Sequence, residues 1–161
     1  MEAIVKVGTF TTNLVNDTNI KVKRARSNHQ KTDFTKDLIL VDNLGGAIRQ
    51  GGNDKFDGDN EVMSYNDGYI QAFTFDFYGN NAYLLATRFV ALLKTQNSFN
   101  LQKELGLTFK SPSNITDVRQ QTGVSYFDRY QIEINVNYWD GIDIDTLRMD
   151  ELQLELFKIE Q

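Results

Sequence analysis

The clearest pattern in the chain is a run of alternating phenylalanines that leads directly into a segment with helical periodicity. Phe73, Phe75 and Phe77 fall at every second position and predict a β-strand over residues 71–78, with these rings on one face. Apolar residues over 82–93 recur at the spacing of an amphipathic helix. The predicted apolar stripe consists of Ala82, Leu85, Ala86, Phe89, Leu92 and Leu93. Packing this stripe on the phenylalanine face would contribute about 1.5–3 kcal/mol per large side chain, so we expect it to form the centre of the core.

The rest of the pattern predicts shorter elements and one longer strand. Strict alternation over 126–138 indicates a half-buried antiparallel strand, after which Trp139-Asp140-Gly141 begins a linker. Asn66-Asp67-Gly68 is typical of a hairpin turn, and Asn80 or Asn81 is expected to cap the helix that follows. The pattern over residues 3–15 favours a short helix that ends at Asn16-Asp17, although Ala3, Val5 and Val7 also alternate as in a strand. The other predicted elements are strands over 20–26, 37–42 and 61–65, a short helix over 101–105 ending at Gly106, an extended segment over 107–109 and a last strand over 152–156.

Two long polar segments interrupt these elements. Residues 27–36 separate the first two predicted strands, and residues 45–60 contain five glycines and almost no apolar side chain. We expect both to be extended loops, since a loop of this length within a compact domain is usually functional or mobile. Taken together, the pattern predicts a single α+β domain over residues 1–161. Its sheet is expected to be mostly antiparallel and to be packed by one long helix and one or two short ones.

Composition and charge narrow the function classes. The chain has 161 residues, of which 40% are hydrophobic, and it lacks cysteine, which removes disulfides, thiolate metal sites and cysteine nucleophiles. No apolar run approaches the length of about 18 residues needed for a membrane-spanning helix. The first residues lack the basic leader and apolar core of a secretory signal. A formal net charge of −5 offers no general attraction to DNA or to anionic membranes.

Residues capable of chemistry are present but are not arranged for it. The single histidine, His29, lies in a polar loop, and no Gly-x-Ser-x-Gly turn accompanies it. The glycine pairs Gly45-Gly46 and Gly51-Gly52 lack the Gly-Lys-Ser/Thr of a phosphate-binding loop. Acidic residues form two groups, and neither has the spacing of a calcium loop. The first consists of Asp54, Asp57, Asp59 and Glu61, and the second of Asp140, Asp143 and Asp145. Weak calcium binding stays open as an alternative. We therefore assign no catalytic, cofactor-binding or metal-ligating residue, and we expect no enzymatic activity.

One dense basic cluster stands out against the acidic average. It consists of Lys21, Lys23, Arg24 and Arg26 on a predicted strand, where Lys21 and Lys23 would project to one face and the two arginines to the other. Such a split disfavours a continuous nucleic-acid stripe. The pattern is typical of an edge strand guarded by cations, or of a strand that pairs with acidic loops of another subunit. Contact with DNA is the remaining alternative.

The order of these elements resembles the bacteriophage neck or tail terminator proteins. The resemblance rests on the aromatic strand 71–79 with its helix, the segment 101–107, the alternating strand 130–138, and the strand–loop–strand segment 20–45. It covers most of the chain, and its motifs are hydrophobic patterns with a few punctuating residues. The sequence departs from the family pattern at 27–37, where an expected proline is missing, and at 45–60, which is longer than usual.

This resemblance implies a structural virion protein that works without a cofactor. It implies a six-membered ring that caps the tail tube, stops its polymerisation and joins the tail to the head connector. The expected partners are other copies of the chain, the tail tube protein and a head–tail connector or head-completion protein, with the tail sheath as a further candidate. DNA would only pass through the lumen, and no membrane would be involved. The expected location is the tail or neck of the virion, after assembly in the bacterial host cytoplasm.

Two other readings remain open. The chain could serve as another phage head–tail or tail component, such as a tube, head-completion or baseplate protein. A non-viral ligand-binding or enzymatic α+β domain would instead use the aromatic strand as the floor of a pocket, and it would need polar groups that converge in a concavity.

Overall fold

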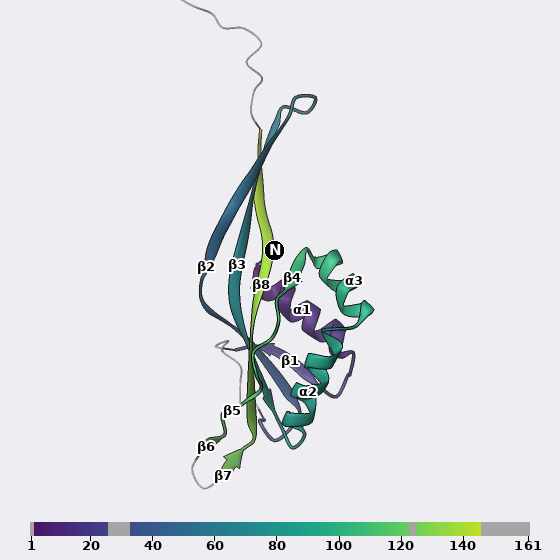
Figure 1. Cartoon of the computed structure of the whole chain (residues 1–161), viewed down its shortest axis with the longest axis vertical. Helices are drawn as coiled ribbons and strands as arrows, with labels where there is room; N and C mark the ends of the chain where they lie inside the picture. The colour runs from purple at the N-terminus through teal and green to yellow at the C-terminus, as the bar shows by residue number, and fades with distance from the viewer. Residues whose placement is uncertain (1, 26–32, 123–124, 146–161) are drawn as a thin grey trace, which may run out of the picture.

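The structure is a computed structural model that describes residues 2–25, 33–122 and 125–145. Its helices are α1 (Ala3–Val15), α2 (Ala82–Leu92) and α3 (Gln96–Leu105). Its strands are β1 (Lys21–Arg24), β2 (Leu38–Asp57), β3 (Val62–Tyr78), β4 (Leu107–Phe109), β5 (Thr116–Asp117), β6 (Gln120–Thr122), β7 (Ser125–Phe127) and β8 (Arg129–Asp145). The three helices lie on one side of a long twisted sheet (Figure 1).

The main sheet is mixed but mostly antiparallel, which confirms the predicted α+β class. Its strands follow the order β1-β2-β3-β8-β4, and β5 also pairs with β8. Only β1 and β2 run parallel, whereas the other pairs of this sheet are antiparallel. The short strands β6 and β7 form a separate hairpin. Because β1 is first in this order, one of its edges has no strand partner within the described residues.

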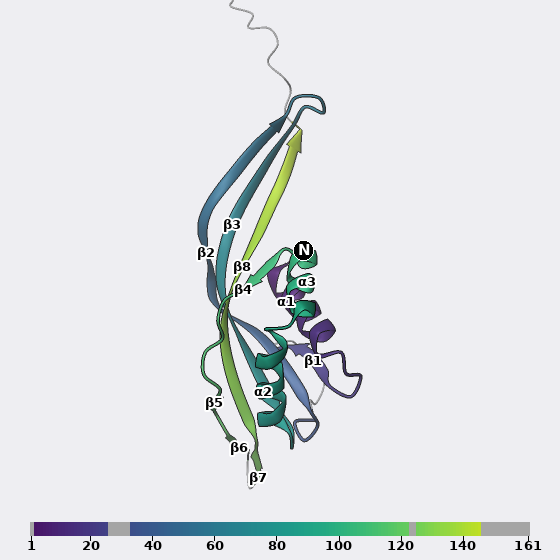
Figure 2. The ribbon, with the colours of Figure 1, turned by 45° about the vertical axis from the view of Figure 1, so that its right-hand side comes forward.

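The core lies between the sheet and the helices, as the aromatic strand predicts. Phe73, Phe75 and Phe77 are fully buried, and the rings of Phe75 and Phe89 lie 5.1 Å apart. Of the predicted stripe on α2, five side chains are buried and Leu92 is half-buried. Helix α1 contributes four side chains to the same core, those of Ile4, Val7, Phe10 and Leu14. Figure 2 shows the helices packed along the same face of the sheet.

The helix ends differ in how well local signals predict them. Helix α1 ends at the predicted place, where Asn16 adopts the left-handed conformation (φ 45°). Helix α3 begins earlier than predicted because the Thr95 hydroxyl caps it, accepting the Ser98 N–H at 3.3 Å. It ends at the predicted Gly106. The predicted side-chain cap of α2 is wrong. Asn81 holds the N-cap position, but its side-chain amide donates to Asp37 at 3.3 Å instead of accepting from the helix.

The largest departure from prediction is the glycine-rich segment 45–60, which is not a loop. Strand β2 continues through it to Asp57, the chain turns at residues 58–61, and β3 returns. Asn66-Asp67-Gly68 lies within β3, so the predicted hairpin turn is also wrong. The predicted linker at Trp139 is wrong as well, since β8 runs on to Asp145. Three strands therefore extend together beyond the helices (Figures 1 and 2).

This extension is called the arm below and comprises residues 45–68 and 139–145. Cross-strand pairing explains why its glycines do not form a loop. Strand β3 pairs with β2 on one side and with β8 on the other along the whole arm, so backbone hydrogen bonds offset the weak strand preference of glycine. The register between β2 and β3 shifts between Leu44 and Ile48 and again between Arg49 and Gly51, so the pairing is irregular at these two places.

Some predicted features lie outside the described residues. These are His29, Arg26, residues 27–32 of the first predicted loop, and the last predicted strand over 152–156. The remainder of the first loop, residues 33–36, is irregular, and the Asp33 carboxylate accepts the Thr35 N–H at 3.1 Å. Within the described residues, no helix is long and apolar enough to cross a membrane.

Candidate interaction surfaces

The sheet face that packs against the helices in the body continues along the arm, beyond the helices. Along β3 and β8 the paired residues Phe73 and Ile134 face the helices, and alternation places the pair Tyr65 and Ile142 on the same face further out. Helices bury this face in the body, whereas in the arm it is open. Tyr65 and Ile142 are 42% and 62% exposed. Tyr65, Asp67, Tyr69, Asp140, Gly141 and Ile142 line a shallow hollow of about 250 Å³ there. We call this the helix-side face of the arm.

Polar contacts fasten the arm strands to one another. The Arg49 guanidinium on β2 contacts the Asp67 carboxylate on β3 through two nitrogens, at 2.6 and 2.8 Å. Hydrogen bonding to Arg49 holds the pKa of Asp67 below its usual value. At the turn, the Asp57 carboxylate accepts the Asp59 N–H at 3.1 Å and the Asn60 side-chain amide at 2.8 Å. These bonds are the kind by which aspartate stabilises tight turns, and they close the arm at its tip.

The opposite face of the arm is packed in part by a single tryptophan. Trp139 on β8 lies over Gly68 on β3, and a Cβ at Gly68 would meet the indole ring at 3.4 Å. Gly68 is buried although it lies in the arm. Because Gly68 has no side chain of its own, the Trp139 ring lies directly over its backbone.

The arm concentrates the negative charge of the molecule. It holds eight acidic and two basic side chains, a net charge of −6, whereas the whole chain carries −5. The acidic residues are Asp54, Asp57, Asp59, Glu61, Asp67, Asp140, Asp143 and Asp145. The two acidic groups singled out in the sequence thus belong to one arm. Among the described residues, no group of three or more carboxylates or histidines is close enough to hold a metal ion.

The basic cluster lies on β1, at the edge of the sheet in the body of the molecule. Lys21 and Lys23 form no ion pair within the described residues, while Arg24 lies 3.3 Å from Glu2 of α1. Between α1 and β1 there is a groove of about 370 Å³. It is lined by Ile4, Val5, Gly8, Thr9, Thr12, Asn13, Val22, Lys23, Arg24 and Val41. We call this the α1–β1 groove.

A buried ion pair fastens the sheet at the end opposite the arm. Asp76 on β3 is buried and contacts Arg129 at 3.0 Å, while the Gln131 amide donates to it at 3.1 Å. Burial lowers the pKa of Arg129, but the hydrogen bond and charge of Asp76 raise it more, so its pKa lies above the usual value. The guanidinium also lies 5.7 Å from the centre of the Tyr78 ring. This arrangement is structural, because each polar group already has its partner.

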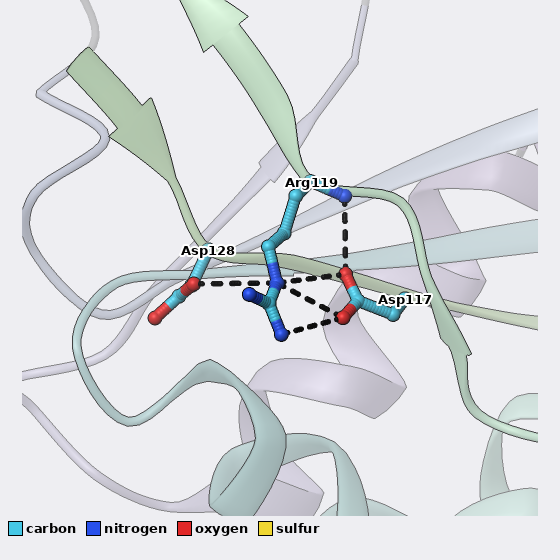
Figure 3. A network of polar contacts seen from close by, with 3 residues as sticks. All are labelled: Asp117, Arg119 and Asp128. Atoms are coloured by element: carbon cyan, nitrogen blue, oxygen red, sulfur yellow. Dashed lines mark hydrogen bonds and ion pairs between the residues drawn. The ribbon is translucent and has the colours of Figure 1, made fainter.

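An exposed network near the same end shapes the turn between β5 and β6. Arg119 contacts the Asp117 carboxylate at 2.8 and 2.9 Å, and its backbone N–H donates to the same carboxylate at 3.2 Å (Figure 3). Asp128 lies farther away, at 3.9 Å from the guanidinium (Figure 3). All three side chains are about half exposed, so solvent screens these contacts and they stabilise the fold little. The network orients the turn without forming a pocket for a ligand.

The structure does not support the other ligand sites that the sequence suggested. The glycine pairs of the rejected phosphate loop lie in strand β2. The aromatic strand cannot form the floor of a pocket, because Phe73, Phe75 and Phe77 are fully buried under the helices. Sequence reasoning missed the arm. The alternation of isoleucine and aspartate from Ile142 to Asp145 was the signal that could have revealed the last part of β8 as a strand.

Comparison with known proteins identifies a family. The family model described as "Phage neck terminator protein" matches residues 4–157. A search of the curated proteins found no significant match.

Proposed function

This chain belongs to the phage neck terminator protein family, and on that premise we propose that it forms a ring that caps the tail tube, stops its polymerisation and joins the tail to the head connector. Family membership makes the chain a structural component of the tail or neck of a phage virion, where it interacts with other tail and head proteins. The match over nearly the whole chain is the observation that carries the proposal.

The shape of the subunit supports a terminating role. The acidic three-stranded arm extends from one end of the sheet, and the short strands β5, β6 and β7 lie at the other (Figures 1 and 2). A ring of such subunits would present two unlike faces. One face could add to a growing tube while the other refused a further tube ring and received the connector. Six subunits is the stoichiometry that we propose from the family resemblance.

The charge of the chain supports a ring through which DNA passes without binding. Each subunit carries a net charge of −5, and a ring would multiply this value. Like charges on the ring and on DNA repel one another, so a lumen lined with carboxylates would not retain DNA during ejection. The basic cluster on β1 would then have to lie away from the lumen. Pairing of that cluster with another protein surface would meet this requirement.

The decisive experiment measures tube length. Tail tube protein of the same phage is polymerised with and without an equimolar amount of this chain, and tube lengths are measured in negative-stain images. We expect short tubes that bear a ring at one end, together with a particle of about six subunits by native mass spectrometry. Unchanged tube lengths with no particle at the ends would refute the capping role. If the chain alone forms long tubes, a tube-protein role replaces it.

A further inference from the structure

We propose that the helix-side face of the arm docks into the α1–β1 groove of a second copy of this chain, so that subunits join head to tail. This inference rests on the proposed ring, and it names the two surfaces that form the contact between neighbours.

The first surface is the helix-side face of the arm. Helices cover this face in the body of the molecule but not in the arm, within the described residues. In the body, α1 and α2 bury the face that carries Phe73 and Ile134. In the arm the same face is open and carries both apolar and charged side chains. Its exposed apolar side chains are Phe56, Tyr65, Ile142 and Ile144. Large apolar side chains exposed together on one face are typical of an interaction site.

The second surface, the α1–β1 groove, offers apolar side chains, open space and an unpaired strand edge. The α1–β1 groove has apolar walls from Ile4, Val5 and Val22, and Val5 is 46% exposed on the helix. Gly8 leaves open space in the groove, since a Cβ there would meet no atom within 4 Å. One edge of β1 also lacks a strand partner within the described residues, so its backbone can pair with an incoming strand.

The arm and the groove region carry charges of opposite sign. The arm has a net charge of −6, so the remainder of the chain, including the groove, has a net charge of +1. On the helix-side face Asp54 and Asp140 lie in no ion pair within the described residues. Lys23 lines the groove, and Lys21 lies two residues earlier on β1; neither lies in an ion pair within the described residues. Docking the arm in the groove would pair these charges, whereas docking arm on arm would bring like charges together.

Geometry makes the contact intermolecular. In both views the tip of the arm lies far beyond the helices, while β1 lies in the body near α1 and α2 (Figures 1 and 2). One copy therefore cannot place its own arm in its own groove. Each copy has one arm and one groove, and the two surfaces differ, so the contact is heterologous. Repetition of such a contact closes into a ring when the rotation per subunit allows it.

Disulfide cross-linking tests the contact directly, because the chain has no native cysteine. The double variant Val5→Cys/Ile142→Cys places one thiol in the groove and one on the arm. After mild oxidation we expect a ladder of dimers, trimers and higher species on a non-reducing gel, lost on reduction. Each single variant should give dimers at most, because it has one thiol per subunit. A double variant that gives no ladder would overturn the proposal.

A charge exchange provides the second test. Lys21→Glu/Lys23→Glu makes the strand β1 beside the groove acidic, and Asp54→Lys/Asp140→Lys makes the helix-side face of the arm basic. Each variant alone should self-associate at least tenfold more weakly than the wild type, and an equimolar mixture should recover association through alternating copies. Circular dichroism checks that both variants fold, which we expect because the substituted side chains lie on the surface. Association that is unchanged in both variants, or not restored in the mixture, contradicts the proposal.

The outcomes separate this inference from the proposed function. If the wild type shortens tubes but the cysteine variant forms no ladder, the capping role stands and the arm–groove contact is wrong. If the ladder forms and the charge exchange behaves as described but tubes grow to full length, the contact stands and the capping role is wrong.

Discussion

At the scale of single residues, a cluster of buried aromatic rings holds the fold together. Phe75 lies at its centre, with ring centroids 5.1 Å from Phe89 and 6.4 Å from Phe109. Phe109 in turn stacks on Phe10 of α1 at 4.3 Å. Helices α1 and α2 and strands β3 and β4 therefore meet in one group of rings. Aromatic pairs of this kind contribute about 0.5–1.5 kcal/mol beyond the area that they bury.

The first prediction concerns this cluster. Phe75→Ala should lower the free energy of unfolding by about 3–5 kcal/mol, because it removes a fully buried ring and leaves a cavity between sheet and helices. Urea denaturation followed by circular dichroism measures the change. The matched control is Phe99→Ala on α3, where the same atoms are removed from a ring that is 55% exposed. We expect the control to change stability by less than about 1 kcal/mol. Equal losses in the two variants would show that Phe75 is not central to the core.

The residue scale also shows why one predicted cap is wrong. A side-chain cap needs a residue whose backbone is extended just before the helix, so that its oxygen reaches the first-turn N–H groups. Thr95 before α3 has this conformation (ψ 156°) and caps the helix. Asn81 before α2 does not (ψ 20°), and its amide binds Asp37. The residue type was suitable in both cases, and the backbone conformation decided the outcome.

At the scale of elements, the arm depends on close approach between β3 and β8. Gly141 on β8 lies opposite Asn66 on β3, and a Cβ at position 141 would lie 2.5 Å from the Tyr65 carbonyl oxygen. That oxygen belongs to the backbone of a paired strand, so it cannot move without breaking the pairing. Glycine at 141 is thus required by the distance between the strands.

The second prediction follows from this approach. Gly141→Ala should force β8 away from β3 in the arm and leave the body folded, because the core residues lie elsewhere. Hydrogen exchange should become faster at arm amides such as those of residues 62–68, with little change in the amides of α1 and α2. The control is Gly46→Ala in β2, where a Cβ would meet no atom within 4 Å. Slow exchange in the arm of Gly141→Ala, equal to that of the control, would contradict this account.

The arm also shows where prediction of elements reaches its limit. The dipeptide Asp-Gly is the strongest short signal for a hairpin, and it occurs three times, at residues 57–58, 67–68 and 140–141. The sequence predicts the turn at the second site, whereas in the structure the chain turns at the first. Nothing local distinguishes them. Pairing of β3 with β8 through Gly68 and Trp139 makes the second site part of a strand. Local turn chemistry is therefore overruled by a contact with residues far away in the sequence.

At the scale of the whole molecule, the arm has a net charge of −6, and all other residues of the chain together have a net charge of +1. The total of −5 conceals this division, because it reports only the sum. The basic cluster and the acidic groups are both visible in the sequence, where pairing between subunits is one interpretation of them. Their positions at different ends of the sheet now give that reading a geometry, since one copy cannot satisfy both surfaces.

The third prediction concerns salt. If arm and groove attract one another by charge, self-association should weaken as sodium chloride rises from 0.05 M to 1 M, because the screening length falls to about 3 Å. Sedimentation velocity at several protein concentrations measures the association constant, which we expect to fall by about tenfold or more. The charge-exchanged mixture should show the same dependence. Association that strengthens with salt would indicate an apolar contact with no role for the charges.

The amino-acid sequence by itself determined the α+β class, the helix 3–15, the buried phenylalanine face with its amphipathic helix, and the family. These depend on side chains two to four positions apart, whose periodicity reports which face of an element avoids water. Only the tertiary structure decided that a glycine-rich segment is a strand and that an expected linker extends β8. It also decided that two separate acidic groups share one arm. Each of these depends on backbone pairing between segments distant in the sequence, and the short alternation over Ile142 to Asp145 is the one trace of it that the sequence shows.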